Sequence, residues 1–270
     1  MLRGIYTGAA GMISETTRLD VIANNLANVN TAGFKRGRSV HASYPSMEIF
    51  RVGDQSQNRY GPSAGARLDR PPHVGPLGTG TWVDHIEYVM EPGPFRFTGE
   101  PLDLAIEGDA FFVVSTPRGE RYTRAGEFSI DPVGRIVTQS GEPLLGERGE
   151  ITLPPGTSPE RIVVTREGEV IVEGVTVDRI LVAEFESPSR LQREGRNLLA
   201  ESPESGAPEP VVPGEGGIAI NQGYLEGSNV NAVEELVNMI EATRVYEANQ
   251  RVILAQDESL SKAVNEVGRV

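Results

Sequence analysis

The sequence predicts an α+β protein: N- and C-terminal helices that pair into a coiled-coil-like domain, an antiparallel all-β domain inserted between them, and irregular connecting segments. Two observations lead to this prediction. At both ends of the chain, apolar residues recur at alternating steps of three and four residues, which is the spacing of a helical seam. Between residues 99 and 217 the apolar period becomes two and glycines interrupt it at short intervals, as in a sandwich or barrel-like domain.

The N-terminal helix is predicted from a seam that starts at Leu2 and extends to Leu26. All of its positions except Thr16 are apolar: Leu2, Ile5, Ala9, Met12, Thr16, Leu19, Ala23 and Leu26. This spacing fits a heptad seam and, equally, an amphipathic helix that packs on its own domain. Asparagine, threonine and glycine between Asn28 and Gly33 predict the end of the helix there.

The C-terminal helix has the strongest helical pattern in the chain. Asn231 followed by Glu234 fits a polar N-cap with an acidic third residue, and Ser228 is an alternative cap. The seam that follows keeps the same spacing through Met239, Ala242, Tyr246, Asn249, Ile253, Gln256, Leu260, Ala263 and Val267. Its two polar members, Asn249 and Gln256, cost stability and can fix the register of a helix pair.

The middle of the chain predicts short strands, with a type I turn at Asp131-Pro132-Val133-Gly134. The strand-like segments are residues 104–106, 110–114, 135–138, 161–165, 169–172 and 180–185. Glycine and proline make residues 51–80 and 202–217 look irregular or extended. The predicted domains are a terminal helical assembly domain (1–30 and 231–270), an irregular or extended connecting domain (31–98 and 203–230) and a β-rich outer domain (99–202).

The composition limits the classes of function. The chain has 270 residues and a net charge of −13, which argues against a nucleic-acid partner or binding to an anionic membrane. It contains no cysteine, so disulfides, thiol catalysis and thiolate metal sites are excluded. Because no run of about 18 apolar residues occurs, we expect no direct insertion into a membrane. The N-terminal stretch is also too short and too polar for a cleaved secretory signal.

The sequence offers no convincing catalytic, cofactor or metal site. His41, His73 and His85 lack helical metal-ligand spacing. The segment Gly78-Thr79-Gly80 lacks the third glycine of a dinucleotide loop, and neither a phosphate-loop motif nor a nucleophile elbow occurs. We therefore predict a protein that is not an enzyme and holds no cofactor or metal.

The charged residues that remain have simple explanations. Carboxylate pairs such as Asp103 with Asp109 are expected by coincidence in a chain with 38 acidic residues. Lys35, Arg36 and Arg38 form a small basic cluster after the first helix. A solvated face or an ion pair between subunits explains this cluster at least as well as a phosphate site does.

Four segments resemble those of one family. NNLANVNTAGFKR (Asn24–Arg36) resembles the N-terminal signature of flagellar rod and hook proteins, and SNVNAVEELVNMIEATRVYEANQRVI (Ser228–Ile253) resembles their C-terminal signature. PLDLAIEGDAFFVV (Pro101–Val114) and YTRAGEFSIDPVGRIVT (Tyr122–Thr138) are similar to the β-domain motifs of the same family. The four segments follow the family's order and cover roughly a quarter of the chain.

The resemblance implies a structural role in an axial assembly. In such proteins the terminal helices join those of neighbouring subunits in the inner tube of a helical structure, and the β domain faces outward. The implied partners are other copies of the chain, other flagellar rod and hook-family proteins, and the flagellar type III export apparatus. Export by that route needs no cleaved signal peptide and would place the protein in the periplasmic rod of the basal body.

The sequence resembles two types of rod subunit, the proximal and the distal. The opening MLRGIYTGAAGM and the phrase GEPLLGERGEITLP resemble the proximal-rod type, which we favour. The run EELVNMIEATRVYEANQRVI resembles the distal-rod type equally well. A hook protein is disfavoured, because its outer domains usually make the chain much longer.

The assembly interface implied by this resemblance follows both helices and the signatures beside them. Its predicted residues are Ile5, Met12, Leu19, Asn24, Asn25, Leu26, Asn28, Phe34, Asn229, Asn231, Leu236, Met239, Tyr246, Asn249, Ile253 and Leu260. A seam without a partner exposes apolar surface, so we expect assembly to order it.

Two hypotheses from other classes remain at this point. A secreted β domain that binds a ligand would predict surface exposure rather than polymerisation. A hydrolase with convergent carboxylates would predict a deep acidic pocket. Neither function needs helices at both ends of the chain, so the paired seams count against both.

Overall fold

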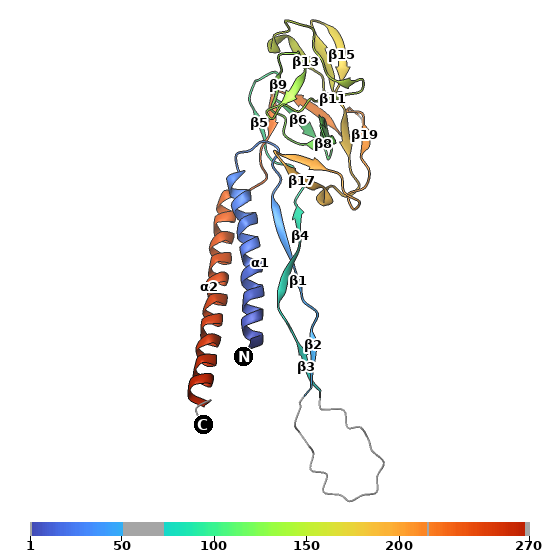
Figure 1. Ribbon diagram of the computed structural model, residues 1–270. Coiled ribbons are helices and arrows are strands. Elements are labelled where there is room, and N and C mark those ends of the chain that lie inside the picture. Colours follow the sequence, from blue (N-terminus) through green and yellow to red (C-terminus); the bar gives the residue numbers. More distant parts are fainter. Residues whose placement is uncertain (1, 51–72, 215, 268–270) are drawn as a thin grey trace, which may run out of the picture. The chain divides into compact units, whose positions relative to one another are not determined.

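The computed structural model describes residues 2–50, 73–214 and 216–267, and these form two compact units (Figure 1). Unit 1 takes the described residues of Met1–Asp20, Ser39–Ile86 and Met239–Val270, and unit 2 those of Val21–Arg38 and Glu87–Asn238. The elements confirm the α+β class, with a helix at each end and a mostly antiparallel β domain between them.

The two long helices begin and end close to the predicted positions. α1 spans Leu2–Ala27, and α2 spans Ala232–Lys262 before a π-helical turn at Ala263–Val267. Asn231 is the N-cap of α2, because its Oδ1 accepts the backbone N–H of Val233 at 3.0 Å and of Glu234 at 3.4 Å. No helix in the described part of the chain is long and apolar enough to cross a membrane.

Burial along α2 follows the predicted seam. From Met239 to Lys262, the buried or half-buried positions are Met239, Ala242, Tyr246, Asn249, Ile253, Gln256 and Leu260, and every residue between them is exposed. Ala263 continues the pattern as a half-buried residue, and the burial of Val267 lies outside the described side chains. One face of α2 therefore packs against other parts of unit 1, as the three-four spacing predicts.

Burial along α1 follows the prediction only in part. Two of the predicted seam positions, Thr16 and Ala23, are exposed. The buried positions are Gly8, Ser14, Val21, Ile22 and Asn25. The buried face contains glycine, serine and asparagine, which a search for apolar periodicity overlooks.

A two-stranded ribbon occupies part of the segment that was predicted to be irregular. Its strands are β1 (Gly37–Ser43), β2 (Met47–Phe50), β3 (His73–Leu77) and β4 (Thr81–Tyr88). β1 pairs with β4 and β2 with β3. The prediction of an irregular segment over residues 31–98 misses these pairings. Burial alternates along β3 and β4, but apolar side chains such as Val74, Trp82 and Ile86 occupy exposed positions, so apolar and polar residues do not alternate in the sequence. Residues 51–72 lie outside the described part.

Unit 2 is built from short antiparallel strands. They are β5 (Phe95–Phe97), β6 (Leu104–Glu107), β7 (Phe111–Thr116), β8 (Gly119–Thr123), β9 (Phe128–Ile130), β10 (Ile136–Thr138), β11 (Leu145–Gly146), β12 (Gly149–Glu150), β13 (Ile162–Val164), β14 (Glu169–Val172), β15 (Val175–Arg179), β16 (Val182–Glu184), β17 (Gln192–Gly195), β18 (Leu198–Ala200), β19 (Glu209–Val211), β20 (Ala219–Gln222) and β21 (Tyr224–Glu226). Short 3-10 helices occur at Pro159–Arg161 and Pro188–Arg190. The largest sheet has the order β17-β18-β8-β7-β16-β19, and β13-β14-β15 form a second sheet.

Three of these strands lie in residues 203–230, which were predicted to be irregular or extended. β19 pairs with β16 at the edge of the six-stranded sheet, β20 pairs with β6, and β21 pairs with β5. Strands this short give little periodicity, and the prolines and glycines around them dominate the pattern. The predicted turn at Asp131–Gly134 is confirmed, because Gly134 N–H donates to Asp131 O at 2.9 Å.

The core of unit 2 covers both faces of the six-stranded sheet. Along β7, Phe112 and Val114 enter one apolar cluster, and Phe111 and Val113 enter another. Successive residues of a strand point to opposite faces, so the continuous apolar run of β7 has a partner on each side. This packing makes β7 the centre of unit 2, on which the loops of the candidate site are held.

Candidate assembly site

Three glycines of α1 face the seam of α2 within unit 1. A Cβ placed at Gly11 would lie 2.8 Å from Asn249 Nδ2, and one at Gly8 would lie 3.0 Å from Ile253 Cγ1. A Cβ at Gly4 would lie 3.2 Å from Gln256 Cδ. As the residue number rises along α1, the number of the contacted residue falls along α2, so the two helices are antiparallel. Because glycine has no side chain, the helices can approach each other closely at these positions. Both polar seam residues thus lie against glycine.

Large apolar side chains remain on the outer faces of the helices. Tyr6 and Ile13 of α1 are among the most exposed apolar residues of the described chain. On the first turns of α2, Val233, Leu236 and Val237 are exposed. A helix at the surface of a monomer normally turns polar residues outward, so these faces are candidates for contact with another chain.

Two asparagine side chains, those of Asn25 and Asn229, form hydrogen bonds with the backbone of unit 2. Asn25 Nδ2 donates to Gly37 O at 2.8 Å, and its Oδ1 accepts from Gly37 N at 2.9 Å. Asn229 Oδ1 accepts from Arg36 N at 2.7 Å, and its Nδ2 donates to Val89 O at 2.8 Å. Both side chains therefore join the last turn of α1 and the segment before α2 to nearby backbone within unit 2.

Beside these asparagines lies a buried ion cluster, formed by Lys35, Arg124 and Glu226. Lys35 Nζ lies 2.5 Å from Glu226 Oε1, and Arg124 Nη1 lies 3.4 Å from Glu226 Oε2. The side chains of both cations are 4% exposed, and that of Glu226 is 1% exposed. Gly93 N–H also donates to Glu226 Oε1 at 3.0 Å, and Lys35 donates to Glu91 O at 2.8 Å. One carboxylate thus contacts two cations, and the three groups together keep a net positive charge.

Burial dominates the titration of both cations in this cluster. Removal from water lowers the pKa of Lys35, although the attraction of Glu226 acts in the opposite direction. Removal from water also lowers the pKa of Arg124, again against the attraction of Glu226. Glu226 is the carboxylate in direct contact with both cations, so the cluster ties the turn after α1 and the loop after β8 to β21.

Each residue of the basic cluster seen in the sequence has an acidic partner within unit 2. Lys35 pairs with the buried Glu226, whereas Arg36 Nη1 lies 3.1 Å from Glu234 Oε1. Arg38 Nη2 lies 2.8 Å from Glu87 Oε2. The expectation of a solvated face or an ion pair between subunits is therefore wrong for Lys35, because its carboxylate partner comes from the same chain, far away in sequence.

Arg193 lies between two aromatic rings and contacts the backbone of Lys35. Its guanidinium carbon is 4.2 Å from the centre of the Phe34 ring and 4.6 Å from that of Tyr88. Its Nη2 donates to Lys35 O at 2.8 Å, and burial lowers its pKa. Phe34, which was predicted as an interface residue, is buried and forms one side of this sandwich.

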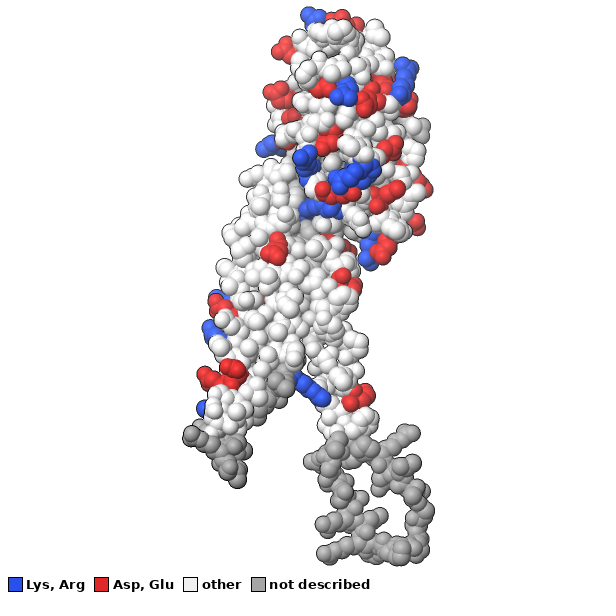
Figure 2. Space-filling model, viewed as in Figure 1, with Lys and Arg blue, Asp and Glu red and all other residues white. Residues whose placement is uncertain are grey.

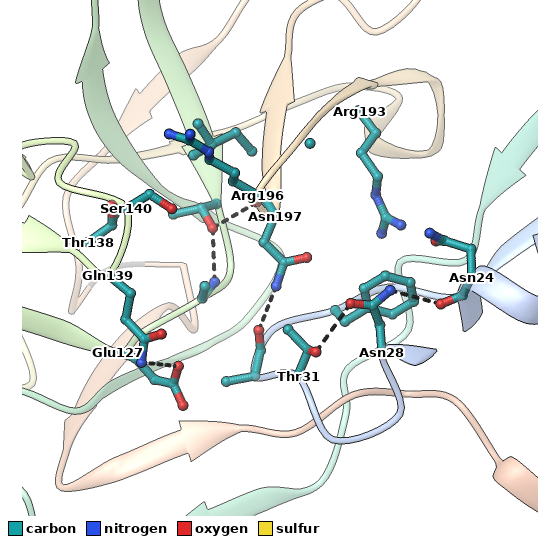
Figure 3. A pocket seen from close by; sticks show the side chains of 16 residues that line it. Asn24, Asn28, Thr31, Glu127, Thr138, Gln139, Ser140, Arg193, Arg196 and Asn197 are labelled. Carbon is teal, nitrogen blue, oxygen red and sulfur yellow. Dashed lines mark hydrogen bonds between the residues drawn. The ribbon is translucent and has the colours of Figure 1, made fainter. Parts of the chain in front are cut away.

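A pocket of about 420 Å³ opens next to Arg193 within unit 2 (Figure 3). Its walls come from the end of α1 and the turn after it, the loop between β8 and β9, the turn after β10, and the turn between β17 and β18. Asn24 and Asn28, both predicted interface residues, line one side of it. Glu127, Gln139 and Ser140 line the opposite side.

The predicted interface residues fall into three groups by exposure. Asn25 and Phe34 are buried. Asn24, Asn231 and Leu236 are exposed. The others are half-buried: Ile5, Met12, Leu19, Leu26, Asn28, Asn229, Met239, Tyr246, Asn249, Ile253 and Leu260.

Sequence reasoning missed several residues of this site. Arg124, Arg193 and Glu226 carry no local signal, since each reaches partners far away in the chain. The glycines of α1 could have been noticed, because Gly4, Gly8 and Gly11 follow the same three-four spacing as the seam. Small residues at that spacing are typical of helices in close contact.

The histidines lie on the ribbon and pair with their neighbours. His41 Nε2 lies 3.0 Å from Ser39 Oγ, and His85 Nδ1 lies 3.0 Å from Asp84 Oδ2. His73 contacts Glu48. In the described ranges, no group of three or more His, Cys, Asp or Glu residues is arranged to hold a metal ion.

Three stretches of the chain match families of known proteins. Residues 5–35 match the family described as Flagella basal body rod protein. Residues 105–172 match the Flagellar hook protein FlgE/F/G D1 domain, and residues 221–266 match the Flagellar basal body rod FlgEFG protein C-terminal family.

Curated relatives align over nearly the whole chain. The flagellar basal-body rod protein FlgG of Bacillus subtilis is 36% identical over 272 residues, which cover 98% of this chain and 99% of the relative. FlgG of Caulobacter vibrioides is 36% identical over 267 residues, with 96% and 97% covered. The flagellar hook-basal body complex protein FlhO of Bacillus subtilis is 29% identical over 284 residues, with all of both chains covered.

Proposed function

This chain belongs to the flagellar basal-body rod protein family, and from that membership we propose that it is a subunit of the distal part of the rod. It is a structural component of the flagellar basal body and not an enzyme, and it assembles with other flagellar rod and hook-family proteins. The relatives named FlgG, which are distal-rod proteins, support the distal type. The preference for the proximal type, drawn from the sequence, is not confirmed by them.

The distribution of exposed apolar residues supports a place for unit 1 among neighbouring subunits. Unit 1 contains fewer than half of the described residues but more than half of the exposed large apolar side chains. On the face drawn in Figure 2, acidic and basic side chains gather over the strands of unit 2, while the helices and the ribbon show wide uncharged areas. Charged surface suits contact with water, and apolar surface suits burial between copies.

The helix pair is the element that we propose to build the rod. In this proposal α1 and α2 form a coiled-coil-like pair through the glycine contacts, and the pair joins those of neighbouring copies. Seam residues such as Met239 and Ile253 then act within the pair, and Leu236, Val233 and Val237 act between copies. Copies related by a rotation that does not close form an open helical filament, which is the geometry of a rod.

The remaining parts of the proposal follow from the same membership. The predicted domain division, with a helical assembly domain, a connecting domain and a β-rich outer domain, describes how the subunit would be arranged in the rod. The flagellar export apparatus would carry the chain out of the cytoplasm without a cleaved signal peptide. A nucleic-acid partner is not proposed, because the chain is strongly acidic.

Quantitative mass spectrometry of purified hook-basal bodies tests this function. We expect the chain to be present at a copy number several-fold above those of the other rod proteins, as a distal subunit requires. A copy number similar to theirs would overturn the distal assignment and leave the rod assignment in place. Absence from the particle would overturn both.

Paired cysteines test the contact between the two helices. The chain has no cysteine of its own, so any disulfide in a double variant must join the introduced residues. We expect Gly11→Cys with Asn249→Cys to form a disulfide within the purified subunit on mild oxidation, because the two positions are in contact. Gly11→Cys with Gln250→Cys is the control, since Gln250 is exposed on another face of α2. Equal yields from both variants, measured by intact mass, would contradict the pairing.

A further inference from the structure

The pocket beside Arg193 contains a cation that lacks an acidic partner. In the part of the chain that the structure describes, no carboxylate pairs with Arg193, and its Nε is buried without a hydrogen-bond partner. The other arginine of the pocket, Arg196, lies 3.6 Å from Glu142. Glu127 accepts a hydrogen bond from Gln139 Nε2 at 2.8 Å on the opposite wall. Arg193 is thus the charge that an incoming group can neutralise.

The walls of the pocket are held in place before anything binds. Gly195, Arg196 and Asn197 all have positive φ angles, of 87°, 49° and 59°, in the turn between β17 and β18. This turn is fastened from both sides: Asn197 Nδ2 donates to Ala32 O at 2.8 Å, and Thr123 Oγ1 donates to Asn197 O at 2.9 Å. Left-handed residues other than glycine cost energy and persist only where surrounding contacts fix them. A fixed wall of this kind lowers the cost of ordering a site on binding.

The polar groups around the pocket suit a polypeptide segment. Figure 3 shows the guanidinium of Arg193 turned toward the side chains of Asn24 and Asn28, with Gln139 and Ser140 across the opening. Amide side chains both donate and accept, as the backbone of an extended segment does. A carboxylate between these walls would form a charge-assisted hydrogen bond with Arg193, which is stronger than a neutral one.

We propose that this pocket receives an extended segment from a second copy of this chain, and that a carboxylate side chain of that segment pairs with Arg193. The chain itself is rich in suitable groups, with 38 acidic residues and a net charge of −13. In an open helical assembly, each copy presents one surface to the copy before it and a different surface to the copy after it. A pocket on one copy and an acidic segment on the next satisfy that requirement. The inference rests on the proposed function, because it needs copies in contact.

A photoreactive amino acid tests the occupant. We would place p-benzoylphenylalanine at Ser140, which is exposed on the rim, and irradiate both purified subunits and isolated hook-basal bodies. Ser158, an exposed residue of unit 2 outside the pocket, is the matched control position. In the basal bodies we expect the probe at Ser140 to link two copies of this chain, through a peptide that contains an acidic residue. The monomer should give no such product.

A second pair of variants tests the role of the charge. Arg193→Met removes the cation and keeps the length of the side chain, whereas Arg193→Lys keeps the cation. In the background with the probe at Ser140, we expect Arg193→Met to lower the yield of linked copies about ten-fold, and Arg193→Lys to retain most of it. Thermal unfolding of each purified variant shows whether unit 2 remains folded. Equal yields from folded Met and Lys variants would overturn the pairing with a carboxylate.

The other outcomes separate this inference from the function on which it rests. A link to a different protein, or the same link in the purified monomer, would overturn a second copy as the occupant. Absence of any link in basal bodies that do contain the chain would overturn the pocket as a contact site and leave the rod function intact. Absence of the chain from basal bodies would overturn both.

Discussion

Glu226→Gln is expected to lower the free energy of unfolding of unit 2 by about 3–5 kcal/mol. The glutamine keeps the shape of the side chain but removes the negative charge from the buried ion cluster. Lys35 and Arg124 would then remain as two buried cations without a carboxylate in contact, in a place where water solvates them poorly. The loss measures the penalty of uncompensated charge rather than the value of the ion pairs themselves.

Chemical denaturation followed by circular dichroism measures this loss. The only tryptophan, Trp82, lies in unit 1, so its fluorescence follows that unit separately. Glu194→Gln is the matched control: Glu194 pairs with Arg121 at 2.9 Å and with Arg118 at 3.0 Å, but its side chain is 23% exposed. Water and salt screen such a pair, and we expect the control to lose at most about 1 kcal/mol. Similar losses from both variants would show that the burial of Glu226 adds nothing to the cost of removing its charge.

The helices are the part of the fold that the sequence predicts well, and the reason is that their signal is local. In α2 the buried or half-buried residues recur every three or four positions, so Met239, Tyr246 and Ile253 can be assigned to one face from spacing alone. In α1 the buried face passes through Gly8 and Ser14. The close approach of α1 to α2 at Gly8 depends on the absence of a side chain, and a search for apolar periodicity does not detect such a position.

The ribbon could not be predicted for a different reason. A strand can be predicted from a sequence when one of its faces is buried and the other is exposed to solvent, because apolar and polar residues then alternate. In the ribbon, Tyr44, Met47 and Phe50 are exposed together, and Trp82 and Ile86 are exposed on the other strand. Apolar and polar positions therefore do not alternate between core and solvent. The apolar residues are present in the sequence, and in the proposed assembly neighbouring subunits would cover them.

The sequence indicated residues that lie in the candidate site, but it did not indicate their contacts. Asn25 and Phe34 were expected at an interface between subunits because they belong to the N-terminal signature, Asn24–Arg36. The structure places both inside unit 2, where Asn25 bonds to Gly37, 12 residues away. Lys35 meets Glu226 across 191 residues, and Arg124 meets it across 102. No spacing rule connects such pairs, so only the folded chain reveals that Lys35 and Arg124 share Glu226.

Gly33→Ala is expected to have a second large effect on the same region. Gly33 has a φ angle of +67°, and a Cβ there would lie 2.3 Å from the backbone carbon of Arg124 and 2.4 Å from the nitrogen of Ala125. The left-handed conformation alone costs a residue with a side chain about 1–2 kcal/mol. The collision with backbone, which cannot rotate away, adds about 1–3 kcal/mol or more. We expect the free energy of unfolding of unit 2 to fall by the sum of these terms.

Gly141→Ala separates the two causes. Gly141 also has a left-handed φ angle, of +94°, but a Cβ there would meet nothing within 4 Å. We expect this variant to lose only the conformational part, about 1–2 kcal/mol, in the same denaturation experiment. The difference between the variants then measures how tightly the turn after α1 lies against the loop that carries Arg124.

Because Gly33 N–H donates to Glu226 O at 2.7 Å, Gly33→Ala should also loosen the ion cluster. We therefore expect the double variant, Gly33→Ala with Glu226→Gln, to lose less free energy of unfolding than the sum of the two single losses. Full additivity would mean that the turn and the cluster are held independently, contrary to the geometry.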